Sequence, residues 1–207
     1  MCWNAQVSLN TLLIALFAAV ISVLNNVMSP LSALFLMSYS SMQLAEFFLW
    51  ENINDPVWNR RFSIFAFVLL LIEPFVSIIR MSDDANLHSI RNKMLFAYAI
   101  FIVIVLIAIK TTKQIVFKTT VAPNGHLKWH WLPPAIWLLL PWIVFLITPM
   151  YMMGNNITGV LFVTTILLVS IVTYSKDETW GTMWCWFAAI ASIFYIGQSI
   201  YKSGFCK

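Results

Sequence analysis

Charged residues are scarce in this chain. Asp, Glu, Lys and Arg make up 10% of its 207 residues, whereas a soluble domain carries about 25%. Hydrophobic residues make up 61%, and the mean hydropathy is +0.84. Because a soluble surface must stay largely polar, this much apolar surface cannot all be hidden in a core. The composition therefore predicts an integral membrane protein whose apolar side chains face the lipid bilayer.

The sequence also lacks the short motifs of common soluble enzymes. It has no phosphate-binding loop, dinucleotide fingerprint, serine-nucleophile elbow or HExxH zinc motif. The net charge is +4, but the basic residues lie in short loops between apolar runs, which is typical of contacts with lipid headgroups. We therefore expect no nucleic-acid partner. The three cysteines, Cys2, Cys185 and Cys206, are too few for a disulfide framework, although one disulfide stays open.

Seven apolar runs of near-spanning length follow one another, at residues 7–24, 30–50, 62–79, 94–109, 132–153, 157–174 and 183–201. The fourth is short and would rely on its flanking lysines reaching the interface. The fifth contains Pro133, Pro134, Pro141 and Pro149, which predicts a kinked or broken helix. We expect one all-α membrane domain over residues 1–207, folded as a seven-transmembrane helix bundle.

The loop between the fourth and fifth runs differs from the other connections. Residues 110–131 are basic and rich in β-branched side chains, and Pro123-Asn124-Gly125 separates the strand-like segments 114–121 and 126–131. Asn-Gly between two such segments is the strongest short signal for a hairpin. We expect a small β-hairpin between helices 4 and 5, lying against one membrane face.

Charge and aromatic residues give the expected orientation. Seven spans place the termini on opposite sides, with seven Lys and Arg on the N-terminal side and five on the other. The positive-inside rule then predicts a cytoplasmic N-terminus. Trp and Tyr gather near the ends of several runs, as in the aromatic belts of membrane interfaces; they are Trp3, Trp50, Trp58, Trp129, Trp131, Trp137, Tyr174, Trp180 and Tyr201.

The topology places four chemically active residues at one membrane face. Cys2 precedes the first span, Glu46 lies near the end of the second, His126 (or His130) lies in the hairpin, and Cys185 is within the first turn of the seventh. Two thiols, an imidazole and a carboxylate can bind one tetrahedral metal such as zinc or another transition metal. The same groups could make a thiol nucleophile with a His/Glu partner. We therefore predict Cys2, Glu46, His126 and Cys185 as metal ligands, with Glu46 and His126 in catalytic roles.

Two of these residues, Glu46 and Cys185, also have a simpler interpretation. Glu46 shares a helical stripe with Tyr39, Gln43 and Trp50, and intramembrane acids are usually functional, but it could be hydrogen-bonded near the interface. Cys185 could be a packing residue in a stripe of small side chains, with Ala189, Ser192 and Ser199.

Glu73, in the third span before Pro74, lies toward the opposite face. It could belong to an ion pathway or pair with Arg80.

Four motifs resemble a known family. The opening Met1-Cys2-Trp3-Asn4-Ala5 with Ser8 resembles the MC[FW]SA-x-x-S start of small multi-pass membrane proteins of bacteria, fungi and large DNA viruses. Residues 43–50, 125–127 and 184–189 are similar to its Q-x-x-E-x-x-x-W, GH[IL] and LWC-x-x-AA segments. The resemblance implies no particular activity. It does imply that Cys2, Glu46, His126 and Cys185 belong together, which favours His126 over His130.

The chain departs from the family pattern at two places. Phe47 stands where the bacterial form has Gly, and Glu73 stands where an uncharged residue precedes the Pro.

Three functions follow from these residues. The first is a metal-binding or thiol-dependent membrane enzyme that uses the one-faced cluster. The second is a small transporter or channel with Glu46, alone or together with Glu73, as an intramembrane carboxylate. The third is a structural or assembly protein in which Cys2 and Cys185 form a disulfide or pack together. The expected partner is the lipid bilayer, and the oligomeric state stays open.

Overall fold

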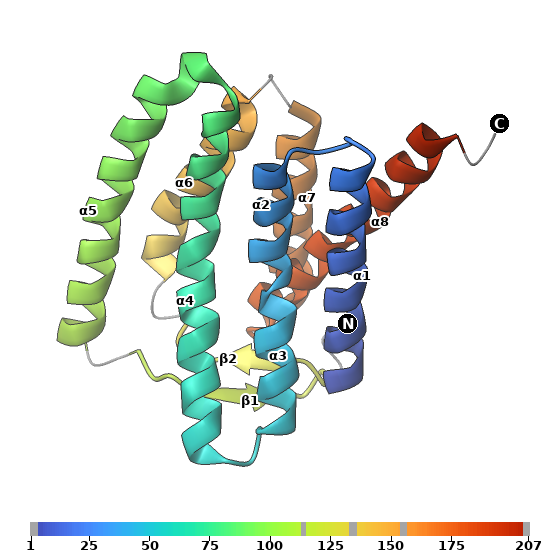
Figure 1. Cartoon of the computed structure of the whole chain (residues 1–207). Helices are drawn as coiled ribbons and strands as arrows, with labels where there is room; N and C mark the ends of the chain where they lie inside the picture. The colour runs from blue at the N-terminus through green and yellow to red at the C-terminus, as the bar shows by residue number, and fades with distance from the viewer. Residues whose placement is uncertain (1–3, 113–114, 133–135, 154–156, 205–207) are drawn as a thin grey trace.

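The computed structural model describes residues 4–112, 115–132, 136–153 and 157–204, which form a helix bundle with one small hairpin (Figure 1). The α-helices are α1 (Ala5–Leu24), α2 (Pro30–Ser40), α3 (Met42–Glu51), α4 (Pro56–Arg80), α5 (His88–Thr112), α6 (Ile136–Met152), α7 (Ile157–Tyr174) and α8 (Trp180–Ser203). Two 3-10 turns, η1 (Met81–Asp83) and η2 (Ala85–Leu87), join α4 to α5. Because α3 continues α2, the described helices make seven rods, which confirms the predicted all-α seven-helix bundle.

Among the described residues, five helical segments are long and apolar enough to cross a membrane by themselves: Ala5–Leu24, Pro56–Asp83, Ala85–Thr111, Ile157–Tyr174 and Trp180–Ser203. Helix α6 is shorter, and α2 and α3 approach spanning length only together.

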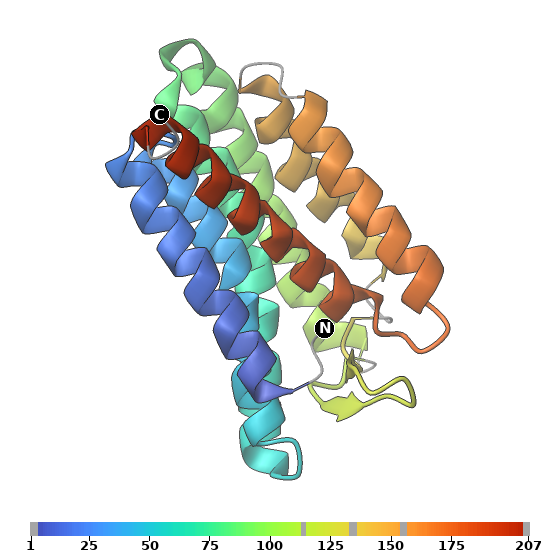
Figure 2. The same cartoon turned by 90° about the vertical axis from the view of Figure 1, so that its right-hand side faces the viewer.

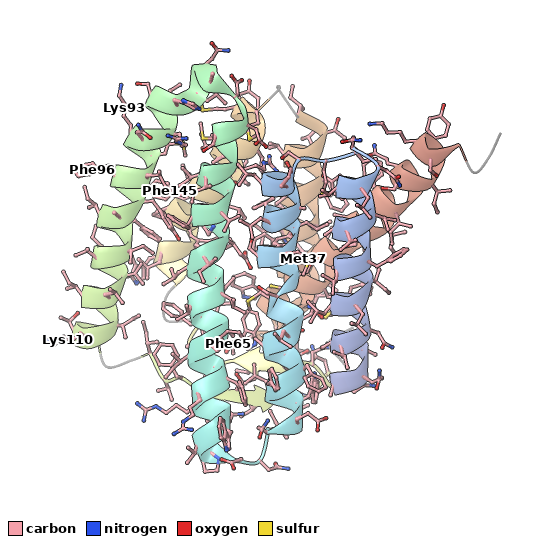
Figure 3. All side chains as sticks on the ribbon, viewed as in Figure 1. Met37, Phe65, Lys93, Phe96, Lys110 and Phe145 are labelled. Atoms are coloured by element: carbon pink, nitrogen blue, oxygen red, sulfur yellow. The ribbon has the colours of Figure 1, made fainter. Side chains whose placement is uncertain are left out.

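Large apolar side chains face outward along these helices. Phe17 is 56% exposed, Phe96 71% and Val172 81%. Figure 3 shows Phe96 pointing away from the bundle, while Lys93 and Lys110 lie at opposite ends of α5. Exposed apolar surface on this scale would be unfavourable in water but suits a lipid environment, so the chain is a membrane protein.

Helices α4 and α5 extend furthest beyond their apolar runs. Helix α4 begins at Pro56 rather than at residue 62, because the Asp55 side chain accepts hydrogen bonds from the Val57 and Trp58 amides (2.9 and 3.0 Å) and Pro56 suits the first helical position. Helix α5 covers His88–Thr112, so the expectation of a short fourth span at 94–109 is wrong.

Helix α6 is continuous through Pro141 and Pro149, so the predicted break is not found within its described residues. Pro133 and Pro134 lie outside the described residues.

A serine interrupts the second rod. Ser41 separates α2 from α3, and its hydroxyl donates to the Ser38 carbonyl of the preceding turn. A hydroxyl that bonds back onto its own helix competes with the backbone ladder and bends the helix. The predicted single span 30–50 is therefore two helices in line.

Helices α5 and α6 each donate a side-chain hydrogen bond to the backbone of α4 near Pro74. Proline has no N–H, so the Leu70 carbonyl four residues earlier loses its helical partner. The Trp142 indole of α6 donates to that carbonyl (2.6 Å), and the Tyr98 hydroxyl of α5 donates to the neighbouring Leu71 carbonyl (2.5 Å). Partners on adjacent helices allow a proline to be tolerated inside a membrane span.

The predicted hairpin is present and shorter than expected. Strand β1 (Thr119–Val121) pairs antiparallel with β2 (Leu127–Trp129), and Gly125 has a φ of 78°, the left-handed conformation that glycine tolerates best. The hairpin lies across the end of the bundle where α1 begins and α3 ends (Figure 1). Helix α8 starts beside it and crosses the bundle obliquely to the other end (Figure 2). The cytoplasmic placement of the N-terminal end stays a prediction.

Candidate functional site at the hairpin end

The hairpin is fixed to the start of α8. The Asn124 amide donates to the Thr179 hydroxyl (2.9 Å), and the Thr182 hydroxyl donates to the Leu127 carbonyl (3.1 Å). Lys128 and Glu178 form an ion pair with a 2.9 Å separation. These contacts hold the turn that carries His126 against the helix that carries Cys185.

The hairpin is also fixed to α4. The Asn59 side chain pairs with the backbone of Thr119, donating to its carbonyl (3.0 Å) and accepting from its amide (2.9 Å), as a neighbouring strand would. The Ser63 and Thr119 hydroxyls are 2.8 Å apart. All three side chains are buried, so β1 is packed against α4 through a contact inside the protein.

The two hairpin histidines have different surroundings. His126 is 5% exposed, and its ring meets the Tyr174 ring edge-on at 5.6 Å. Burial lowers the pKa of the His126 imidazole, and the Asp177 carboxylate opposes this shift only in part. His130 is half-buried, and its Nε2 lies 2.8 Å from the Thr120 hydroxyl.

Burial, followed by the charges of Lys128 and Lys118, lowers the pKa of His130. Both imidazoles are therefore neutral at neutral pH, which is the form that binds metal or accepts a proton.

Cys185 lies in the wall of an apolar cavity that the sequence did not reveal. The cavity has a volume of about 60 Å³ and lies between α4, α5, α6, α8 and the hairpin. Aromatic rings dominate its lining, which comprises Phe67, Phe101, Trp129, Trp131, Trp142, Trp180 and Trp184 as well as Cys185 and seven further residues. Cys185 is only 2% exposed, so its thiol is inside the protein.

The aromatic cavity corrects part of the belt prediction. Trp129, Trp131 and Trp180 are 2%, 1% and 6% exposed, and the rings of Trp129 and Trp131 stack at 5.0 Å. They are interior residues and do not face the lipid interface. Trp58 and Trp137, at 45% and 54% exposed, do face outward as expected. Apolar character alone does not say whether a Trp at the end of a span faces lipid or protein.

Glu46 belongs to the buried polar row that the helical spacing predicted. Tyr39, Gln43 and Glu46 are 8%, 0% and 0% exposed, and Trp50 is partly buried. The Tyr39 ring meets the Trp184 ring of α8 edge-on at 6.3 Å, and Tyr39 is within electrostatic range of Cys185. The row therefore faces the part of α8 that borders the cavity.

The structure thus places three of the four predicted site residues in the hairpin half of the bundle. Glu46, His126 and Cys185 come from α3, the hairpin and α8, and all three are buried. Cys2 lies outside the described residues. Within the described residues, no group of three or more His, Cys, Asp or Glu side chains is arranged to hold a metal ion.

The suggested pairing of Glu73 with Arg80 is wrong. The Arg80 guanidinium instead lies over the Phe35 ring (5.0 Å to its centroid), and its Nε is 3.3 Å from the Met153 sulfur. Glu73 is fully buried, and neither of its oxygens has a hydrogen-bond partner within the described residues.

Comparison with protein-family models, curated proteins and solved structures gave no match.

Proposed function

We propose that this chain is a membrane-embedded enzyme whose site at the hairpin end comprises Cys2, Glu46, His126 and Cys185 and accepts an apolar substrate. The observation that carries the proposal is the position of Cys185, in the wall of the aromatic cavity and on the helix that holds the His126 turn. The aromatic lining favours an apolar group of a substrate, and the cavity of about 60 Å³ has room for a small one.

The burial of Cys185 favours a metal over a free thiol nucleophile. A thiol in apolar surroundings stays protonated and is a weak nucleophile, whereas a bound metal deprotonates it. Two thiolates, a neutral imidazole and a carboxylate form a ligand set that zinc accepts. Zinc, when bound, would polarise a substrate carbonyl or activate water. Glu46 and His126 would hold the metal or move a proton at its edge, and the cavity would exclude bulk water.

The resemblance of four separate motifs to the family of small multi-pass proteins supports the same grouping of residues. We infer membership of that family, with Cys2 completing the site.

Elemental analysis of the purified protein in detergent tests whether it contains bound metal. We expect about one equivalent of zinc or another transition metal, lost in Cys185→Ala and retained in Cys206→Ala, which removes a thiol outside the proposed site. Glu46→Gln should weaken metal binding more than Glu51→Gln does, because Glu51 is an exposed acid at the end of the same helix.

An absence of metal in the wild type and all variants would overturn the metal proposal. The thiol version would then require Cys185 to react with a membrane-permeant maleimide and to be protected by an apolar chain compound. Equal labelling with and without that compound would overturn the thiol version too.

A transporter or channel is the second candidate, and the burial of the Tyr39, Gln43 and Glu46 row supports it. Both polar atoms of Gln43 lie in the bundle without a hydrogen-bond partner among the described residues, as expected for groups awaiting water or a solute. Flux of ions or protons into liposomes, compared between wild type and Glu46→Gln, separates the two functions. If the wild-type protein contains no metal but carries a flux that Glu46→Gln loses, the result would favour transport.

A further inference from the structure

Glu73 is a carboxyl group deep in the bundle that the proposed enzyme does not use. It lies within α4, directly before Pro74, and its exposed fraction is 0%. An ionised carboxylate inside a membrane protein is costly unless it is paired or hydrogen-bonded. Its protonation therefore depends on the groups around it.

No basic group compensates a charge on Glu73. The described residues contain no hydrogen-bond partner for either oxygen, and Arg80, two turns along α4, is directed to Phe35 and Met153. Two hydroxyl groups are within electrostatic range, Tyr39 from α2 and Tyr98 from α5.

The other described elements packed on α4 place no cation beside Glu73 either, and η1 adds another acid, Asp83. Helix α3 contributes a second buried acid, Glu46, and has Glu51 at its exposed end. Helix α6 has one ionisable side chain, Tyr151, which is 49% exposed, and strand β1 has none. The basic residues of α5, such as Lys93 and Lys110, lie at its two ends (Figure 3). The neutral, protonated acid is the form that this environment favours.

Tyr39 joins Glu73 to the polar row at the hairpin end. Tyr39 interacts electrostatically with both Glu73 and Cys185, and Gln43 lies four residues later in the chain, in the first turn of α3. The Ser40 hydroxyl and both Gln43 amide atoms are buried without partners in the described part of the chain. Buried polar groups with unused hydrogen-bonding capacity indicate a place where water or a proton can be accepted.

We propose that Glu73 is a reversible proton-binding site in the membrane interior, connected through Tyr39 and Gln43 toward the hairpin end. In the resting protein the carboxylic acid holds its proton. On release, the O–H bond breaks, the electron pair stays on the carboxylate, and the proton passes to a water molecule in the polar row. The site is independent of the proposed metal centre, and the metal content of Glu73→Gln should equal that of the wild type.

A lipid-facing groove gives access to this region for an apolar reagent. The groove lies between α4 and α5, has a volume of about 500 Å³, and includes Leu71, Ile72 and Tyr98 in its wall. Tyr98 thus borders the groove on one side and is within electrostatic range of Glu73. A reagent dissolved in the membrane can enter this groove and reach Tyr98, which interacts electrostatically with Glu73.

Dicyclohexylcarbodiimide, which is apolar and reacts with protonated carboxyl groups, tests the proposal in proteoliposomes. The acid proton moves to a carbodiimide nitrogen, the carboxylate oxygen bonds to the central carbon, and the adduct rearranges to a stable N-acylurea that retains the whole reagent. Peptide mass spectrometry should find this adduct on Glu73 at neutral pH, at a rate that falls as the pH rises. Glu73→Gln should lose it, and the matched variant Glu51→Gln should keep it.

Two results would overturn the proposal. One is an unlabelled Glu73 in the folded protein when the denatured protein is labelled there, which shows that the adduct is detectable. The other comes from infrared spectroscopy, which needs no access for a reagent. The carbonyl band of a protonated carboxylic acid should be present in the wild type and reduced in Glu73→Gln, and identical spectra would show that Glu73 is ionised.

Discussion

The two sides of α8 are packed in opposite ways. Toward α1, the side chains are small: Ala15, Ala18 and Ser22 of α1 are fully buried among the neighbouring helices, and the Ser22 hydroxyl lies 2.9 Å from the Ser199 hydroxyl of α8. Against the hairpin, large rings meet and leave a cavity beside Cys185. Small residues let helix backbones approach each other, which is how helices associate in lipid. The α1 side therefore acts as scaffold, and the space and buried polar groups needed for chemistry are on the hairpin side.

Removing a ring from the hairpin side should have the largest effect on stability. Trp129 is 2% exposed and stacks on Trp131, so Trp129→Ala should lower the free energy of unfolding by about 3–5 kcal/mol. Denaturant titration in detergent micelles measures this. The matched variant Trp137→Ala, at a side chain that is 54% exposed, should change it by less than about 0.5 kcal/mol. Equal losses would show that Trp129 does not hold the hairpin in place.

Enlarging a side chain should distinguish the tightly packed side of α8 from the side with the cavity. Ala18 is 0% exposed in the small-residue contact, so Ala18→Leu should lower the free energy of unfolding by about 1–3 kcal/mol through overpacking. Val105 borders the cavity, and Val105→Leu should cost less than about 1.5 kcal/mol because the added methylene has space. The comparison fails if Val105→Leu costs as much as Ala18→Leu, because the cavity would then offer no usable room.

Two glycines test whether the hairpin turn is under backbone constraint. A Cβ on Gly125 or on Gly197 would meet nothing within 4 Å, but only Gly125 has a positive φ, 78°. Gly125→Ala should lower the free energy of unfolding by about 1–2 kcal/mol, since a side chain is strained in the left-handed region. Gly197→Ala, within α8, should be neutral or stabilising by about 0.5–1 kcal/mol. Equal effects of the two substitutions would rule out a role for the turn conformation.

Acid should weaken the hairpin side through its histidines. Burial lowers the folded-state pKa of His126 below the unfolded value of about 6.5, so the unfolded chain binds more protons in acid. The stability contributed by the neutral imidazole is therefore fully present above about pH 6.5 and is lost as the pH falls toward the folded-state pKa. Thermal unfolding between pH 5 and 8 should show this slope, and His126→Gln should reduce it. An unchanged slope in the variant would contradict the burial of the ring.

Helices and turns were predictable where local chemistry decides them. Long apolar runs predicted the helices, because a spanning helix requires only sufficient apolar length. Asn124-Gly125 predicted the hairpin, because a tight turn requires only residues that adopt its backbone conformation. The helix ends were less predictable. The cap at Asp55 makes α4 begin with polar residues, and a search for apolar runs does not include them. The interruption at Ser41 depends on where one hydroxyl points, which spacing does not reveal.

The candidate site was predictable in part, for a topological reason. Counting spans is enough to place Glu46, His126 and Cys185 in the same half of the bundle, because neighbouring helices alternate in direction. The aromatic cavity and the direction of the Arg80 side chain depend on tertiary packing between distant segments. Position in the sequence alone predicts an interface belt for Trp129, Trp131 and Trp180 and an ion pair for Arg80, and the structure contradicts both.

The central claim is that the hairpin end forms a site in which His126, and not its neighbour His130, takes part. The metal content of His126→Ala beside His130→Ala tests it most directly, because the two residues share one hairpin and differ in burial. We predict that the wild type and His130→Ala each retain about one equivalent of metal and that His126→Ala loses it. A cooperative thermal unfolding transition in all three proteins would show that each is folded. Equal metal content in the two variants, or metal lost only from His130→Ala, would contradict the account.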